Sequence, residues 1–185
     1  MTLNRICRHV RAAARLGGVA VLFGFAAGCA SSDSGWETLS VEGDPFTIEA
    51  PGKSKMQDIS EQNRDLGAIS GRQYSWYPPS NRFYLAMYMT ISNPNGLALD
   101  TKNAMKSMVD GVSRRSGGTI ISEKPVMMAG IEGVETEIKM GSQPGRMRVR
   151  SAERNRTFYL LVVGWPEGQE FLKDENRFFD SFHMK

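Results

Sequence analysis

The chain has 185 residues, a formal net charge of +3, two cysteines and two histidines. This length is typical of one or two domains, and two cysteines are too few for a disulfide framework or a cysteine-rich zinc site. The four arginines of residues 1–28 account for the positive charge, because 19 basic and 20 acidic residues remain without them. A nearly neutral domain gives no support for nucleic-acid binding, which requires a basic surface.

The first 28 residues have the pattern of a secretory signal peptide. They contain four arginines and no acidic residue, and residues 16–28 form an apolar segment of thirteen residues. A transmembrane helix needs about 20 apolar residues, so this segment is too short to span a membrane. A buried core helix is disfavoured because the segment contains four glycines. The sequence therefore predicts that residues 1–28 are removed from the mature chain.

The end of this segment resembles a bacterial lipobox. Residues 25–29 read FAAGC, with small residues directly before Cys29 and alanine at position 26, where a lipobox usually has leucine. The resemblance implies a lipoprotein whose Cys29 thiol carries diacylglycerol and anchors the chain in a membrane. An ordinary signal peptide with an incidental cysteine is the alternative. Because Ala30 and Ser31 provide no aspartate signal for inner-membrane retention, we expect anchoring in the outer membrane, facing the periplasm.

The mature chain has few residues suited to chemistry. Cys7 is removed with the signal peptide and Cys29 carries the lipid, so no thiol is left for a disulfide, a nucleophile or a metal site, and His183 is the one remaining histidine. We therefore expect no metal and no cofactor. Residues 29–43 are predicted to be the lipidated cysteine and a flexible tether, because residues 30–35 are small and polar. Residues 44–185 are predicted to form a single domain.

Hydrophobic periodicity predicts strands followed by a helix, a meander of strands and a second helix. Residues 82–92 form the clearest strand, because both of its faces are apolar, as in a central strand covered on both sides. Residues 100–116 form the clearest helix, with Asp100 or Thr101 as the N-terminal cap. Residues 53–66 are expected to form a loop and residues 130–133 a turn. The remaining strands are predicted at residues 46–48, 67–76, 119–128, 134–140, 146–153 and 157–164, and the second helix at residues 169–180.

This order indicates an α+β domain with an antiparallel sheet flanked by helices. Four short stretches, FTIEAPGK, GIEGVE, RTFYLLVV and FFDSF, resemble PsbP-like domains, which include an extrinsic photosystem protein and bacterial DcrB-like lipoproteins. The resemblance covers residues 44–185 and implies an accessory or binding role without a shared catalytic site. No functional residue is transferred by it.

No nucleotide-binding, hydrolase or metalloprotease motif is present in the sequence. We therefore expect a lipid-anchored, non-enzymatic envelope protein that binds an envelope protein or ligand of unknown identity. A periplasmic hydrolase that uses carboxylates or a serine near His183 is one alternative. A purely structural envelope protein is another.

Three arginines, Arg146, Arg148 and Arg150, share one face of a predicted strand. They are candidates for binding an anionic partner, such as lipid headgroups near the anchor. The other interpretation is that they pair across a hairpin with Glu135 and Glu137, which share a face of the preceding strand.

Tyr77 is a candidate groove aromatic. It follows Tyr74 and Trp76 and precedes two prolines, which cannot continue a central strand. We expect Tyr74 and Trp76 to pack in the core and Tyr77 to be exposed.

Overall fold

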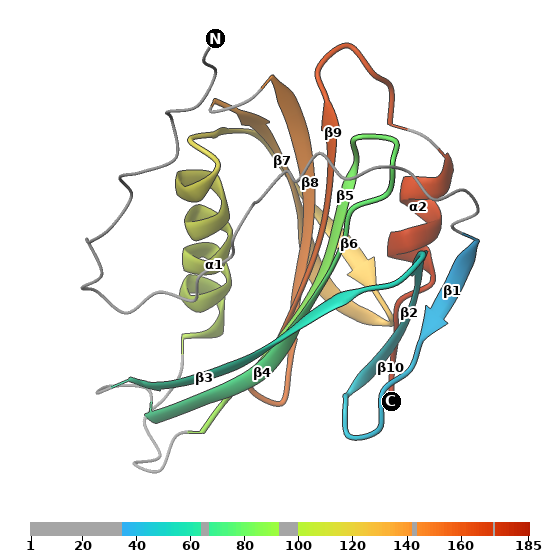
Figure 1. Ribbon diagram of the computed structural model, residues 1–185. Coiled ribbons are helices and arrows are strands. Elements are labelled where there is room, and N and C mark those ends of the chain that lie inside the picture. Colours follow the sequence, from blue (N-terminus) through green and yellow to red (C-terminus); the bar gives the residue numbers. More distant parts are fainter. Residues whose placement is uncertain (1–34, 64–66, 93–99, 142–143, 172) are drawn as a thin grey trace, which may run out of the picture.

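The computed structural model describes residues 35–63, 67–92, 100–141, 144–171 and 173–185. Within these ranges a seven-stranded antiparallel sheet has the strand order β3-β4-β5-β9-β8-β7-β6 (Figure 1). Its strands are β3 (Lys55–Asn63), β4 (Gly67–Trp76), β5 (Phe83–Ile91), β6 (Thr119–Met128), β7 (Ile131–Met140), β8 (Gly145–Arg154) and β9 (Thr157–Pro166).

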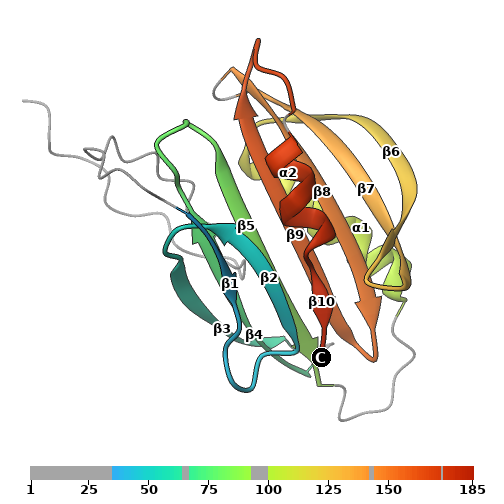
Figure 2. The ribbon, with the colours of Figure 1, turned by 90° about the vertical axis from the view of Figure 1, so that its right-hand side faces the viewer.

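The two faces of this large sheet are covered by different elements. Helix α1 (Thr101–Arg115) lies on one face, whereas helix α2 (Lys173–Asp180) and a small sheet lie on the other (Figures 1 and 2). The small sheet has the order β1-β2-β10 and consists of β1 (Trp36–Leu39), β2 (Phe46–Pro51) and β10 (His183–Met184). The α+β class with a large antiparallel sheet is confirmed, and most of the described chain is sheet.

The core of the large sheet has two chemically distinct halves. On the α1 face, residues of β5, β8 and β9 pack against Val109 and Val112 of α1 and form a mainly aliphatic cluster. On the α2 face, aromatic side chains dominate, and Phe178 contacts both Trp76 and Tyr84 edge-to-face. The prediction that residues 82–92 form an interior strand buried on both faces is confirmed, because β5 lies between β4 and β9 and contributes to both clusters.

Two-residue turns connect β6 to β7 and β8 to β9. Asn155 and Arg156 have φ values of 54° and 62°, and Ala129 and Gly130 have φ values of 48° and 84°. Two successive residues with positive φ form the hairpin turn that matches the twist of antiparallel strands. The predicted turn at residues 130–133 is therefore wrong in its extent, because two residues suffice and Ile131 already begins β7.

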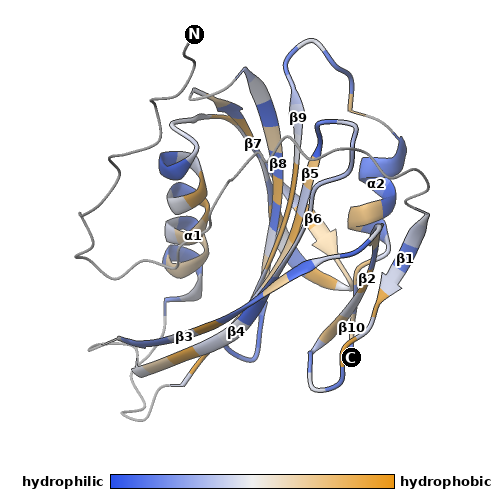
Figure 3. Cartoon of the chain, viewed as in Figure 1, coloured by the Kyte–Doolittle hydropathy of each residue, from blue (hydrophilic) through white to orange (hydrophobic). Residues whose placement is uncertain are grey.

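Helix α1 is amphipathic and capped as the sequence predicts. The Asp100 carboxylate accepts a hydrogen bond from the Asn103 backbone N–H at 3.1 Å, which satisfies one of the free donors of the first turn. Figure 3 shows the apolar side of α1 turned toward the sheet. Neither helix in the described ranges has the length and apolar character needed to cross a membrane.

The structure corrects three predictions about where strands and helices lie. Residues 55–63 of the predicted loop form β3, an edge strand that pairs only with β4 and leaves most of its side chains exposed. Residues 36–39 of the predicted tether form β1, which pairs with β2. The second helix begins at Lys173 rather than at residue 169.

Candidate functional site

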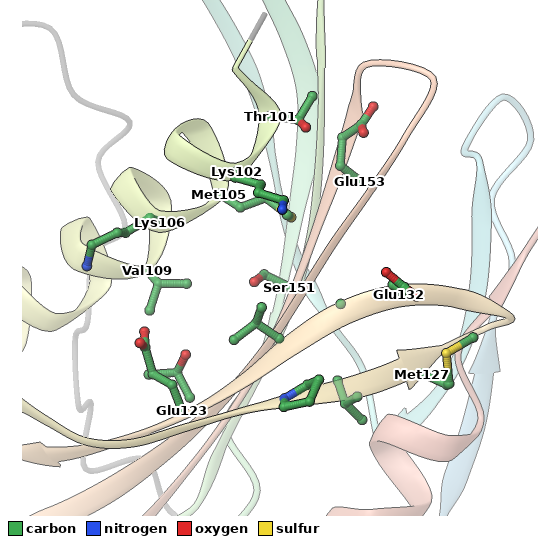
Figure 4. A pocket seen from close by; sticks show the side chains of 15 residues that line it. Thr101, Lys102, Met105, Lys106, Val109, Glu123, Met127, Glu132, Ser151 and Glu153 are labelled. Atoms are coloured by element: carbon green, nitrogen blue, oxygen red, sulfur yellow. The ribbon is translucent and has the colours of Figure 1, made fainter.

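An open groove of about 760 Å³ lies between α1 and strands β6, β7 and β8 (Figure 4). We call it the α1 groove. It exists because only the second half of α1 packs closely on the sheet: Val109, Val112 and Ser113 are buried, whereas Thr101 and Met105 in the first half are partly exposed and line the groove. This volume lies within the range of about 300–1,000 Å³ that is typical of small-molecule sites.

Two buried hydroxyl groups lie at the floor of the α1 groove. Thr136 of β7 and Ser151 of β8 are 0% and 2% exposed, and both line the groove. Among the described residues, neither Thr136 Oγ1 nor Ser151 Oγ has a hydrogen-bond partner. A buried polar group without a partner costs about 1–3 kcal/mol. Both oxygen atoms are shielded from solvent, so they lie beneath the surface of the groove.

These two hydroxyls come from adjacent strands and the same face of the sheet. In the register of β7 and β8, Val134 lies opposite Ser151 and Thr136 lies opposite Val149. The hydroxyls are therefore diagonal neighbours. Val134 and Val109 add apolar surface beside them.

Charged side chains surround this floor. Lys102 projects from α1 toward the sheet, and Glu123 and Glu132 lie at different ends of the β6–β7 side (Figure 4). Other charges at the groove have partners within the chain: Lys106 pairs with Asp110 at 3.4 Å, and Glu153 accepts a hydrogen bond from the Arg156 backbone N–H at 2.5 Å.

The predicted arginine candidates lie on the opposite face of the sheet from the α1 groove. Arg146 contacts Glu137 at 2.9 Å, and Glu135 contacts Arg150 at 2.8 Å and Arg148 at 3.5 Å. This geometry supports the hairpin-pairing interpretation over the anion-binding one.

Further contacts hold the same arginines in place. The Arg148 guanidinium lies 3.8 Å from the centre of the Phe171 ring, and that of Arg150 lies 4.5 Å from the centre of the Phe179 ring. Burial by itself would raise the pKa of Glu135, but hydrogen bonds from Arg150 and Lys124 and the charge of Arg148 outweigh it and lower that pKa. The arginines therefore act within the chain: Arg146 pairs with Glu137, and the other two pair with Glu135 and with the aromatic side chains that accompany α2.

Tyr77 follows β4 and is 37% exposed. The Lys55 ammonium lies 5.7 Å from the centre of its ring. Tyr74 and Trp76 are buried, as predicted. Tyr77 does not belong to the lining of the α1 groove, so the structure does not bring the predicted aromatic to this site.

The remaining candidate residues lie elsewhere. Cys29 is outside the described residues. His183 is an exposed residue of β10, on the α2 face, where its backbone pairs with Thr47. The neighbouring Ser181 hydroxyl donates to the Phe178 carbonyl at 3.1 Å and accepts from the Glu49 N–H at 2.9 Å. Within the described ranges no group of three or more His, Cys, Asp or Glu residues is arranged to hold a metal ion.

Sequence reasoning missed the α1 groove. Its signal was a polar residue in the inward-facing series of a strand: Thr136 lies between Val134 and Ile138, and Ser151 follows Met147 and Val149 at alternate positions. Because Thr136 and Ser151 are both buried, these breaks in an apolar series mark the strands beneath the groove and not the opening itself.

Comparison with known proteins defines the fold. No family model and no curated protein matches the chain. The solution structure of cyanobacterial PsbP (CyanoP) from Synechocystis sp. PCC 6803 is similar, with a TM-score of 0.52 over 87% of this chain and 99% of CyanoP. The fold is PsbP-like. The two sequences are 9% identical, so the likeness concerns the fold alone.

Proposed function

We propose that this protein is a lipid-anchored, non-enzymatic binding protein of the bacterial cell envelope, held at Cys29 in the outer membrane and facing the periplasm. The α1 groove is the site where it binds an envelope component. The observation that carries this proposal is the open groove of about 760 Å³ between α1 and strands β6, β7 and β8, whose lining combines apolar and charged side chains.

Binding, rather than catalysis, is supported by the chemistry of the Thr136 and Ser151 hydroxyls beneath the groove. A serine or threonine nucleophile requires a base that accepts its proton. Within the described ranges neither hydroxyl has a hydrogen-bond partner, and both oxygen atoms are shielded from solvent. Neither is therefore placed to act as a nucleophile on a molecule in the groove.

The anchor rests on the sequence pattern of residues 1–29. Six residues separate Cys29 from Trp36, where β1 begins. Seven residue steps can span at most about 25 Å, so a lipid on Cys29 would keep the domain close to the membrane surface.

Mass spectrometry of the mature N-terminus and membrane fractionation test the anchor. We expect the chain to begin at an acylated Cys29 and to be recovered with the outer membrane, because two or three acyl chains give stable anchoring. Replacement Cys29→Ala should leave the chain unlipidated. An unmodified N-terminus, or a chain that begins elsewhere, would contradict the lipoprotein proposal, and recovery with the inner membrane would contradict the outer-membrane assignment.

Site-specific photo-crosslinking in intact cells tests the groove. Met127 lies at the α1 groove and is 61% exposed, and Met56 at the opposite edge of the sheet is 54% exposed and provides a matched control. A photoreactive residue at position 127 should give one adduct of defined mass, and the same residue at position 56 should not give that adduct. No adduct at position 127, or the same adducts at both positions, would contradict binding at the groove.

A further inference from the structure

We infer that edge strand β3 of the large sheet pairs with β3 of a second copy of this chain, antiparallel and centred on Ile59. This inference goes beyond the proposed function, because it concerns an edge of the sheet and not the α1 groove. It follows from a contrast between the two edges of the sheet, from the register that a second copy would adopt, and from the position of strand β1.

The β3 edge of the large sheet is regular and open. β3 (Lys55–Asn63) pairs with β4 along all nine of its residues without a register shift, and it contains no proline. In the described chain no strand pairs with its other side (Figure 1). The backbone N–H and C=O groups on that side therefore form a continuous row with which another strand can pair.

The opposite edge strand, β6, is interrupted. Its pairing with β7 has a register shift between Ile120 and Ser122, and Pro125 lies within the strand. A bulge twists an edge strand away from a flat partner, and proline has no N–H to donate to a further strand. Both interruptions are absent from β3, so β3 is the edge that can accept a strand along its whole length.

A two-fold axis restricts the register of two antiparallel β3 strands. Residues that lie opposite each other point to the same face of a sheet, and the residues of one face alternate along a strand. The axis must therefore pass through a residue and not between two residues. When it passes through Ile59, this residue, which is buried in the aliphatic cluster of the α1 face, lies opposite its own copy.

The two neighbouring axes give less favourable pairs. An axis through Asp58 would place two carboxylates directly opposite each other, which is destabilising, whereas the axis through Ile59 places Asp58 opposite the neutral Ser60. An axis through Ser60 would place the apolar Ile59 opposite the carboxylate of Glu61. The axis through Ile59 also pairs all nine residues of each strand, with about one backbone hydrogen bond per residue pair.

The register centred on Ile59 brings opposite charges together. Lys55 and Glu61 point to the same face as Ile59, because they lie at alternate positions of the strand. Lys55 would lie opposite Asn63 of the second copy, so Glu61 of the second copy is its diagonal neighbour, within reach of a long side chain. The axis forms this pair twice. Among the described residues neither Lys55 nor Glu61 has an ion-pair partner.

The same axis is compatible with two chains anchored in one membrane. It is perpendicular to the sheet, because two antiparallel edge strands that share one sheet keep the same face on the same side. The two α2 faces therefore point in the same direction. β1 lies on the α2 face and begins at Trp36 (Figure 2), so both chains enter their domains from the same side of the pair. Lipids on both copies of Cys29 could then insert in one membrane.

Disulfide crosslinking of the full chain in cells lysed without detergent tests the inference. In the register centred on Ile59, Met56 lies opposite Gln62 of the second copy, and both side chains are exposed. We expect the double variant Met56→Cys with Gln62→Cys to form a disulfide-linked dimer under mild oxidation, with the 56–62 link identified by mass spectrometry. Within one chain these positions are about 20 Å apart, so they cannot link to each other.

Matched cysteine variants control for chance contacts. Met56→Cys alone and Gln62→Cys alone should give no dimer, because each position lies about 20 Å from its own copy in this register. Ile121→Cys with Met127→Cys has the same spacing at exposed positions of β6 and should give none. The absence of a 56–62 link, a link from β3 to another protein, or equal yields at both edges would overturn the inference.

Exchange of the two charges tests the register. Lys55→Glu and Glu61→Lys, each added to the β3 cysteine pair, should lower the dimer yield at least fivefold, because each puts like charges at diagonal positions. The two exchanges together restore opposite charges and should recover most of the yield. Neither side chain is buried, so the fold should be unaffected. Full yield in both single exchanges, or no recovery in the combined variant, would overturn the register.

The outcome is separate from that of the proposed function. The 56–62 link decides whether β3 pairs with a second copy. A disulfide through Cys29 would instead reveal a free thiol and contradict lipidation. The adduct at position 127 tests the α1 groove, which lies away from β3.

Discussion

The two faces of the seven-stranded sheet differ in how their buried polar groups are paired. On the α2 face the buried carboxylates have partners within the chain: Asp44 accepts hydrogen bonds from Arg72 at 2.8 Å, from Tyr88 at 3.0 Å and from Tyr74. Glu175 of α2 pairs with Arg82, and Glu135 pairs with Arg148 and Arg150. On the α1 face, the hydroxyls of Thr136 and Ser151 lack partners in the described residues. On the α2 face Glu175 Oε2 and Arg148 Nε also lack a hydrogen bond, but both side chains belong to ion pairs.

This difference separates a face closed by internal ion pairs from a face with an open groove. Internal ion pairs fix α2 and the β1–β2 connection on the large sheet, and aromatic contacts fill the space between them. Helix α1, in contrast, is buried mainly through Val109 and Val112. The α1 face therefore keeps an open groove, whereas the buried charged side chains of the α2 face form ion pairs within the chain.

The largest expected effect on stability comes from placing a charge in the buried core of the sheet. Met87 of β5 is buried in the aliphatic cluster on the α1 face. Met87→Asp should unfold the domain, because a buried carboxylate without a partner costs several kcal/mol. Met56→Asp, at an exposed position of β3, is the control and should fold normally. Circular dichroism checks both, and a folded Met87→Asp protein would show that this part of β5 is not core.

The next largest effect concerns the buried pair that attaches α2. Arg82→Ala would leave Glu175 buried without its partner, and breaking a buried ion pair costs about 3–5 kcal/mol. The double variant Arg82→Met with Glu175→Leu should recover most of this loss, because it removes both charges and keeps similar volume. Urea unfolding measures both. If the single variant lost less than about 1 kcal/mol, the α2 face would not depend on this pair.

The fold was predictable wherever one strand or helix carries its own periodic pattern. β4 and β6 have the predicted bounds, and α1 differs by one residue at each end. β3 was missed because an edge strand needs only backbone pairing on one side, so its exposed side chains do not alternate between apolar and polar. β10 was missed because its two residues are held by pairing with β2, far away in sequence.

The candidate site was less predictable than the fold. The series of Arg146, Arg148 and Arg150 is visible in the sequence and indicates a possible anion-binding face. In the structure the partners of these arginines are glutamates of the same chain. The groove depends on the distance between α1 and the strands β6 and β7, which no local pattern encodes. Its hydroxyl residues, Thr136 and Ser151, resemble ordinary strand residues until their burial is known.

A smaller, pH-dependent effect is expected on the α2 face. The arginines and Lys124 lower the pKa of Glu135 below its ordinary value, so its ionised form stabilises the fold. This contribution is present above the unfolded-state pKa of about 4.3 and is lost as the pH falls through the lower folded-state value. Glu135→Gln should therefore cost about 2 kcal/mol at neutral pH, and its difference from the wild type should decrease below about pH 4. Urea unfolding from pH 3 to 7 measures this difference, and a constant difference across that range would contradict the role of the charge.

The smallest effect provides the most direct comparison of the two faces, because it removes one buried or partly buried hydroxyl from each. Tyr88→Phe removes a donor to the buried Asp44 carboxylate and should lower the free energy of unfolding by about 1–2 kcal/mol. Thr136→Val removes a hydroxyl without a partner in the described chain and keeps the side-chain shape. It should leave stability unchanged or raise it by up to about 1 kcal/mol. Urea unfolding of the ligand-free chain compares the two variants. A loss of 1–2 kcal/mol in both would mean that the Thr136 hydroxyl is satisfied without a ligand, and the α1 face would then be as closed in its polar contacts as the α2 face.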